Sequence, residues 1–449
     1  MAWLRIITMY LYFIQAIVIT DGERILGLGD LGSNGMSVPV GKVSLYTALA
    51  GIRPHYCLPI TVDVGTNNTN LLQNDYYPGL QHERVTGEEY DAFMDEVMEA
   101  IAICYGPNVC IHFEDFATDN AFRLLNKYRN QYITFNGDIQ ASGATILAGI
   151  LASSGLTNIK FPNNTFLIHG SGQVNYFYLI QLLGALGIAH FLTQELIQDY
   201  GFSEEEALKK IYLMDSSGLV VKDRVKNKAE GLKALYARSD LGPMNYLNEV
   251  VRAVRPTVLI GVSAQPGAFS REILREMGAI NKRPLIFAMS NPTDRAECTA
   301  EMAYKATECR SIFVSGSPFP SVRTPDGQEY YPSQGNSCYI FPGLALALTC
   351  TGIRPVSDQV FLRAAKTLAS LVTDEHLSQG RIYPPLSDLG KVSLKIAIAL
   401  AEDAFKSGTA SYHPEPKDKA SFIKRKMYNF GYLDFTPECY SFPSFPDAS

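Results

Sequence analysis

Short apolar runs alternate with helical stretches along most of the chain, and this alternation constrains the fold more than any other feature. Up to about residue 140 the apolar runs are AIVIT, LPITVDVG and VCIHFED, with VSLYTALAG and EEYDAFMDEVMEAIAICYG between them. From about residue 141 a second set follows, with NTFLI, IYLMD, TVLIGV, PLIFAM and SIFVSG as its runs. Strands that alternate with helices form parallel sheets whose faces the helices cover. We therefore expect an α/β fold with two doubly wound parallel sheets.

The same pattern predicts two domains and a tail. The first domain is expected over residues 1–140 and the second over 141–412, with returning C-terminal helices such as FLRAAKTLASLV and SLKIAIALAEDAF. Residues 413–449, which end in a stretch rich in Tyr, Phe and Pro, are expected to form an irregular tail. A chain of 449 residues that is 47% hydrophobic is long enough to bury these cores.

Charge and cysteine content limit the kinds of partner. The formal net charge is -6 and no basic block occurs, which argues against nucleic acid and favours small-molecule ligands. The eight cysteines lack CxxC pairs and regular spacing. This pattern argues against a disulfide framework or a zinc site and favours a reducing compartment.

The first twenty residues are strongly apolar, so they also fit a signal-peptide core or a short membrane anchor. Two features favour a core strand with an unusual leader instead. No small-residue cleavage pattern occurs, and Ala16 to Thr20 run without a break into the Gly-rich segment TDGERILGLGD. We therefore expect no membrane association.

Three carboxylates stand at the ends of apolar runs. Glu114 and Asp115 end one run, and Asp138 follows another in TFNGDIQ. Because ligands collect at the carboxyl ends of parallel strands, these side chains could supply the oxygen ligands that a hard divalent cation prefers. Taken alone, the pattern is weak and favours helix caps or salt bridges over a metal site.

Lys42 opens a predicted helix behind a Gly-rich turn, in GMSVPVGKVSLY. A lysine at this place can be a solvated side chain or an anion-binding group at a helix start. It can also be a general base, since burial and nearby positive charge lower the pKa of an amine. The local sequence leaves these alternatives open.

The segment HGSGQVN follows the run NTFLI and opens a helical pattern, which is the place of a dinucleotide-binding turn. Gly170 and Gly172 permit a tight turn, but the third small position is occupied by Asn175.

Further along, Asp215 ends the run IYLMD. An acidic residue there suits a ribose hydroxyl, whereas Ser216 with Lys228 or Lys233 suits the 2'-phosphate of NADP. A merely polar turn is the alternative.

The order of the motifs carries more information than any one of them. TDGERILGLGDLGSNGM, IRPHYCLPITVDVGTNN, IHFEDF, DSSGLVVKDR, RPLIFAMSNPT, SGSPF and GRIYPPL occur in the sequence and spacing of the malic enzymes. The chain therefore resembles this family over roughly residues 16 to 412. The resemblance implies a substrate and metal domain followed by a Rossmann-like NAD(P) domain. It also implies oxidative decarboxylation of malate to pyruvate with NADP or NAD and with Mg2+ or Mn2+.

Individual roles follow from the same resemblance. Arg24 matches the arginine that holds the substrate carboxylate, and Lys42 matches the general base on the malate hydroxyl. Asn291 and Asn336 match side chains that position the substrate and the nicotinamide ribose. The resemblance implies metal ligands at Glu114, Asp115 and Asp138, and cofactor contacts at Gly170, Ser171, Gly172, Gln173, Asp215, Ser216 and Asn291.

Some positions depart from the family's pattern. The family's proton-donating tyrosine lies on an N-terminal helical domain, which we expect this chain to lack. Gly137 stands where the family has an aspartate, and Asn175 and Phe177 stand where small residues are expected. A catalytically weak or inactive paralogue that acts as a regulatory or structural subunit is therefore the alternative reading. A homo-oligomer and pairing with a full-length relative both remain open, as do cytoplasmic and mitochondrial locations.

Overall fold

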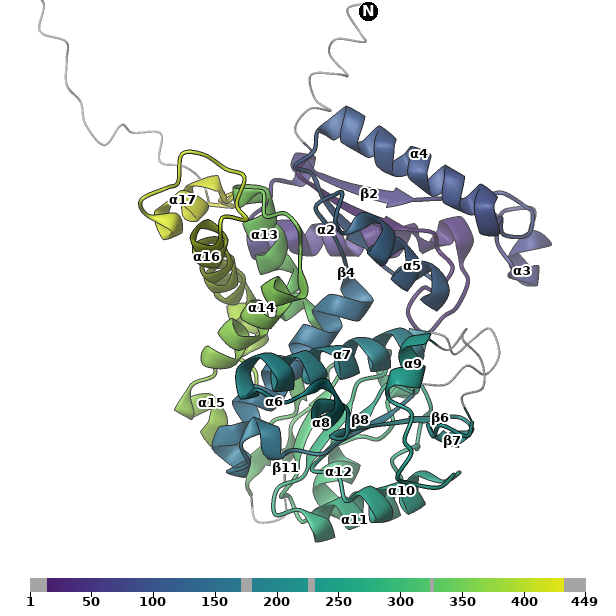
Figure 1. Cartoon of the computed structure of the whole chain (residues 1–449), viewed down its shortest axis with the longest axis vertical. Helices are drawn as coiled ribbons and strands as arrows, with labels where there is room; N and C mark the ends of the chain where they lie inside the picture. Colours follow the sequence, from purple (N-terminus) through teal and green to yellow (C-terminus); the bar gives the residue numbers. More distant parts are fainter. Residues whose placement is uncertain (1–13, 171–179, 225–230, 324–326, 432–449) are drawn as a thin grey trace, which may run out of the picture.

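The computed structural model describes residues 14–170, 180–224, 231–323 and 327–431 (Figure 1). The first sheet has four parallel strands in the order β2-β1-β3-β4. Side chains that alternate along β1 separate its two faces. Ile17 and Ile19 pack with α4 and α5, whereas Ala16 and Val18 pack with α2. The elements are β1 (Ala16–Thr20), α2 (Ser37–Ala50), β2 (Cys57–Thr61), α4 (Gly87–Tyr105), β3 (Cys110–Phe113), α5 (Thr118–Tyr128) and β4 (Thr134–Asn136).

The second sheet has seven strands in the order β13-β10-β9-β8-β5-β6-β7, and only the short β7 is antiparallel to its neighbour. The chain leaves β5 for β6 on one side and later returns to β8 on the other. This reversal is the topological switch point of a Rossmann-like sheet. The strands are β5 (Phe166–His169), β6 (Ile211–Asp215), β7 (Gly218–Leu219), β8 (Val258–Gly261), β9 (Leu285–Ala288), β10 (Ile312–Ser315) and β13 (Ser333–Gln334).

Helices cover both faces of the second sheet, so the predicted α/β architecture with two sheets is confirmed. Three of them pack on the face formed by residues such as Leu167, Leu259 and Ile286. The opposite face meets α6, α7 and α13 in a core that also reaches the first sheet. The helices of the two faces are α10 (Leu247–Val254), α11 (Arg271–Ile280) and α12 (Ala300–Ala306), and α6 (Ser142–Thr157), α7 (Ile180–Tyr200) and α13 (Phe341–Thr351).

The C-terminal helices tie the two domains together. Both α13 and α16 (Leu389–Ser407) contact α2 of the first domain, and α14 (Asp358–Ser370) packs on α6. The irregular tail expected from residue 413 is wrong in part, because α17 (Lys419–Lys426) forms there and packs against α16. Phe422 and Ile423 are buried in this contact, which a short and mostly polar segment did not reveal. Residues 432–449 lie outside the described part of the chain.

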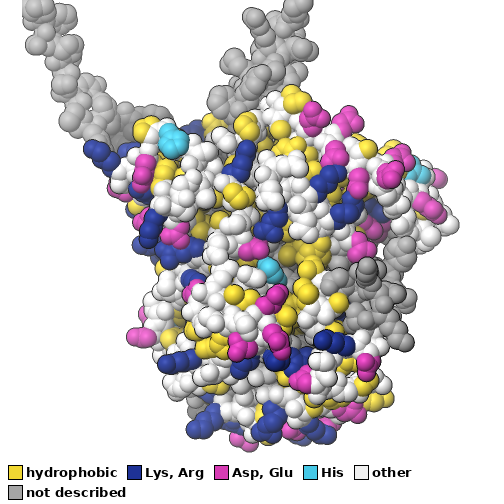
Figure 2. Space-filling view, in the orientation of Figure 1, with side chains coloured by type: hydrophobic (Ala, Val, Ile, Leu, Met, Phe, Trp, Pro, Cys, Tyr) yellow, Lys and Arg dark blue, Asp and Glu magenta, His cyan; other side chains and the backbone are white. Residues whose placement is uncertain are grey.

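One helical stretch in the described residues, Gly137–Thr157, is long and apolar enough to cross a membrane. It packs against α7 and α14, and 67% of its most apolar window is buried inside the protein, as in the core helix of a globular domain. On the face that Figure 2 shows, acidic and basic side chains are interspersed. The apolar first residues, 1–13, lie outside the described part of the chain.

Candidate active site

A cavity of about 170 Å³ lies where the carboxyl ends of the two sheets meet. This is where ligands bind in open α/β folds. The first domain contributes residues that follow β1, β3 and β4, and the second contributes residues that follow β8, β9, β10 and β13. The lining includes Leu26, Gly27, Asp115, Asp138, Val262, Ala264, Met289, Ser290, Asn291, Gly316, Gly335, Asn336 and Ser337.

The three predicted metal ligands form a cluster, in which Glu114 and Asp115 are buried, Asp138 is half-buried, and Asp115 and Asp138 line the cavity. Glu114, Asp115 and Asp138 each offer a carboxylate oxygen, and these oxygens lie within 4.8 Å of one another. The backbone N–H of Asp115 donates to Asp138 Oδ2 at 2.9 Å. Burial raises the pKa of Asp115 well above its usual range and that of Asp138 to about 7, and neighbouring carboxylates raise both further. Acids crowded in this way fit a divalent cation, which would compensate their charge.

Lys42 contacts the cluster through Glu114. Its Nζ lies 2.6 Å from Glu114 Oε1 and 4.6 Å above the centre of the Phe341 ring. Burial opposes the charged amine, but Glu114 outweighs it and raises the pKa of Lys42. For Glu114, burial acts to raise the pKa, whereas Lys42 and His112 lower it to about 2. Glu114 thus connects Lys42 to the carboxylate cluster, because it is both the ion-pair partner of the lysine and one of the three predicted metal ligands.

His112 is a further part of the site that sequence reasoning missed. The Tyr46 hydroxyl lies 2.7 Å from its Nδ1, and the ring stacks on Phe135 with 4.4 Å between centroids. Its Nε2 lies 2.6 Å from Glu114 Oε2, although the two are not aligned as a hydrogen bond. Burial lowers the pKa of His112 and favours the neutral ring. Strand alternation could have signalled this residue, since positions 112 and 114 face the same side.

Gly137 makes room for this arrangement. A Cβ at this position would lie 2.0 Å from Glu114 Oε2 and 2.4 Å from His112 Nε2. The imidazole and the carboxylate therefore occupy the space that a larger residue would need. An aspartate at position 137, which the family resemblance leads us to expect, would clash with His112 and Glu114 at their present positions.

Arg24, like Lys42 and Glu114, is a predicted site residue that does not line the cavity itself. It is buried, and its Nη1 has no hydrogen-bond partner among the described residues. Leu26 and Gly27, which follow it in the same loop, do line the cavity. The Leu26 N–H also donates to Asp115 Oδ2 at 3.3 Å. The loop therefore reaches the carboxylate cluster through the Leu26 N–H, and the Arg24 side chain does not line the cavity.

Two asparagines of the second domain line the cavity opposite the carboxylates. Asn291 Oδ1 accepts from Ser317 Oγ at 2.5 Å, and Asn336 Oδ1 accepts from the Cys338 N–H at 2.9 Å. These bonds orient both amides. Within the described residues neither Nδ2 donates a hydrogen bond, so both donors are available to a ligand.

The nucleotide half of the site is described in part. Gly170 follows β5 with φ 131°, and a Cβ there would lie 2.5 Å from the Val262 carbonyl oxygen, so this turn requires glycine. Asp215 ends β6, and its Oδ2 lies 2.6 Å from Lys233 Nζ and also pairs with Arg224. Ser216 is exposed in the turn that follows. The predicted contacts Ser171, Gly172 and Gln173, and also Asn175, Phe177 and Lys228, lie outside the described residues.

Two family models match the chain. The model described as malic enzyme, N-terminal domain, matches residues 6–129, and the model described as malic enzyme, NAD binding domain, matches residues 139–405. The NADP-dependent malic enzyme of Homo sapiens is 50% identical over 430 residues, which are 96% of this chain and 73% of that protein. The mitochondrial NADP-dependent malic enzyme of Mus musculus is also 50% identical, over 96% of this chain and 69% of its own length.

Solved structures of lower sequence identity share the fold. The malic enzyme of Entamoeba histolytica superposes with a TM-score of 0.70 at 21% identity, covering 94% of this chain and 75% of the other. The malic enzyme of Pyrococcus horikoshii gives a TM-score of 0.67 at 22% identity, covering 93% of this chain and 82% of the other.

Proposed function

Because the chain belongs to the malic enzyme family, we propose that it converts (S)-malate to pyruvate and carbon dioxide while it reduces NAD(P)+. The observation that carries this proposal is the cavity between the domains. There the carboxylates Asp115 and Asp138 face the amides Asn291 and Asn336 across a space of about 170 Å³. A small hydroxy acid can meet a cation on one side and a nicotinamide on the other in such a space.

The proposed metal ligands are Glu114, Asp115 and Asp138, and the proposed ion is Mg2+ or Mn2+. Buried carboxylate oxygens within 4.8 Å of one another suit hard cations of this kind. A bound cation would polarise the ketone of the oxidised substrate and stabilise the enolate that forms as carbon dioxide leaves.

Lys42 is the proposed general base. Its neutral amine would accept the proton of the malate hydroxyl, and a bound nicotinamide would supply the hydride acceptor that oxidation of the same carbon requires. The neutral amine is needed for this step, and Glu114 at 2.6 Å opposes it. Once Glu114 serves as a metal ligand its charge is compensated, and the burial of Lys42 then favours the neutral form.

Arg24 is proposed to hold a substrate carboxylate. A buried guanidinium with an unpartnered Nη1 is a strong donor for an anion. Asn291 and Asn336 are proposed to hold the substrate and the nicotinamide ribose through their Nδ2 groups. Arg24 belongs to the first domain and both asparagines belong to the second, so one substrate would contact both domains.

NADP+ is the proposed preferred nucleotide. Asp215 stands where an acidic residue would hold the ribose, but Lys233 and Arg224 compensate its charge. Two cations beside the ribose position suit a 2'-phosphate. The relatives named NADP-dependent malic enzyme support the same choice.

We also propose an intracellular location. One of these relatives is named as mitochondrial, which supports it.

The test is a direct assay of the purified chain. With malate and Mn2+ or Mg2+, the protein should reduce NADP+ faster than NAD+, with pyruvate formed in equal amount. The variant D138N keeps the side-chain volume but removes a ligand charge, so it should lose metal-dependent turnover. Absence of nucleotide reduction with either metal and either nucleotide would overturn the proposal.

A further inference from the structure

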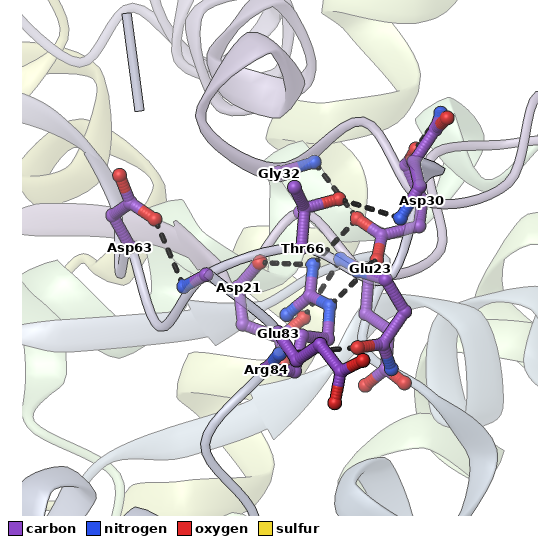
Figure 3. A network of polar contacts seen from close by, with 12 residues as sticks. Asp21, Glu23, Asp30, Gly32, Asp63, Thr66, Glu83 and Arg84 are labelled. Carbon is purple, nitrogen blue, oxygen red and sulfur yellow. Dashed lines mark hydrogen bonds and ion pairs between the residues drawn. The ribbon is translucent and has the colours of Figure 1, made fainter. Parts of the chain in front are cut away.

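The loop of residues 21–31 connects β1 to the 3-10 helix η1 (Gly32–Met36), and a single arginine holds both of its ends (Figure 3). Arg84 Nε and Nη2 donate to the two carboxylate oxygens of Asp30 at 2.8 and 2.9 Å. The same Nη2 donates to the carbonyl oxygen of Asp21 at 2.9 Å. The guanidinium therefore bridges the first residue of the loop and one near its end.

Both anchoring residues are themselves fixed. Asp30 Oδ1 accepts from the Gly32 N–H at 2.9 Å, and Oδ2 accepts from the Asn67 N–H at 2.8 Å. The Tyr90 hydroxyl donates to Asp21 Oδ2 at 2.8 Å. The side chain of the bridging arginine is only 2% exposed and that of Asp30 is 15% exposed. An ion pair shielded from water in this way is screened little by salt.

The loop needs to be held from outside. Gly22 has φ 69° and Leu26 has φ 45°, and the second is a conformation that a leucine rarely adopts. Such a conformation persists only where the surrounding structure enforces it. The same turn carries Arg24 and presents the Leu26 N–H to Asp115. The geometry of the loop thus decides where the substrate-binding guanidinium lies relative to the metal cluster.

We propose that Arg84 is a positioning residue for substrate binding: it closes the 21–31 loop and thereby fixes the place of Arg24 and of the Leu26 N–H that donates to Asp115. This proposal rests on the function proposed above. The bidentate contact with Asp30 and the third bond to the Asp21 carbonyl require a planar fork of N–H donors. A lysine could supply the charge at this position, but it could not make the three bonds with the same geometry.

The experiment compares R84K and R84Q with the wild-type chain. The KM for malate should rise about 10- to 100-fold in R84Q, and less in R84K, because small displacements of binding groups are costly. The KM for NADP+ should rise less than the KM for malate, because the Arg84 bonds hold the ends of the loop, whereas the loop meets Asn291 through Gly27 at its middle. R252Q is the matched control, since Arg252 is 54% exposed and pairs with Glu272 on the far side of the second domain.

Hydrogen exchange gives a readout that does not depend on turnover. The amides of Ile25 and Leu28 bond within the loop and should exchange faster in R84K and R84Q than in the wild type. If R84Q does not fold, R84K and D30N carry the same test. Wild-type KM for malate in the folded variants would overturn the proposal, as would a lower kcat and Tm without a change in KM. An inactive wild type would refute the proposed function, and loop exchange would then decide whether Arg84 holds the loop.

Discussion

The substitution G137A tests the steric relation at the metal cluster. The new methyl carbon would lie 2.0 Å from Glu114 Oε2 and 2.4 Å from His112 Nε2, far inside van der Waals contact. His112 has little freedom to move, because Tyr46 and Phe135 hold its ring. Glu114 must therefore shift away from its present place. Overpacking of this kind costs about 1–3 kcal/mol.

A displaced Glu114 should also weaken metal binding. Changes beside a metal ligand typically lower affinity about 10- to 100-fold, and here the ligand itself moves. Thermal unfolding with and without Mn2+, together with calorimetric titration of Mn2+, measures both effects. G242A is the matched control, because Gly242 is exposed and a Cβ there meets nothing within 4 Å. In an H112A background the G137A penalty should be smaller, since one of the two clashes is gone.

Wild-type melting temperature and Mn2+ affinity in G137A would refute this reasoning. That outcome would mean that Glu114 and His112 can move apart at no cost. The close contacts at position 137 would then not define the geometry of the metal cluster.

Four other predictions follow from the site. Because the pKa of Asp138 is raised to about 7, Mn2+ affinity measured by calorimetry should increase with pH up to about 7 and then level off. The same raised pKa means that, without metal, the folded protein holds the proton of Asp138 more tightly than the unfolded chain does. The free energy of unfolding without Mn2+ should therefore fall as the pH rises from about 4 to about 7. An affinity or a stability that does not change with pH would contradict these expectations. K42Q should lower kcat about 10²- to 10⁴-fold with Mn2+ binding retained, and a kcat near that of the wild type would exclude Lys42 as the base. K233Q should raise the KM for NADP+ more than that for NAD+, and an equal effect on both would argue against a 2'-phosphate contact.

Much of the fold could be predicted because apolar runs and helical stretches alternate so regularly. The run AIVIT became β1, and its side chains are buried on both faces of the sheet. A strand covered by helices on both sides needs such an unbroken apolar sequence. The helix α17 was missed because its buried residues, Phe422 and Ile423, are too few to give a periodic pattern.

The candidate site was predictable where residues follow strands, and less so where loops fold back on the sheet. Asp115 and Asp138 meet because the strands β3 and β4 are parallel neighbours, so their carboxyl ends coincide. Arg84 had no such signal. It lies in a loop, and its contacts with Asp30 and Asp21 span 54 and 63 residues along the chain. Neither periodicity nor a local motif predicts a pairing of that kind.

Position 137 illustrates why a departure from a family pattern cannot be judged alone. From the sequence, glycine there means that a negative charge beside the metal and the base is lost. In the structure the same space holds His112, a neutral ring fixed by Tyr46 and placed 2.6 Å from Glu114. Lys42 has Glu114 as its one ion-pair partner among the described residues, so a single carboxylate would serve both the proposed base and the proposed metal. With glycine at position 137, we therefore expect metal binding at Glu114 to change the protonation of Lys42 through this one shared carboxylate.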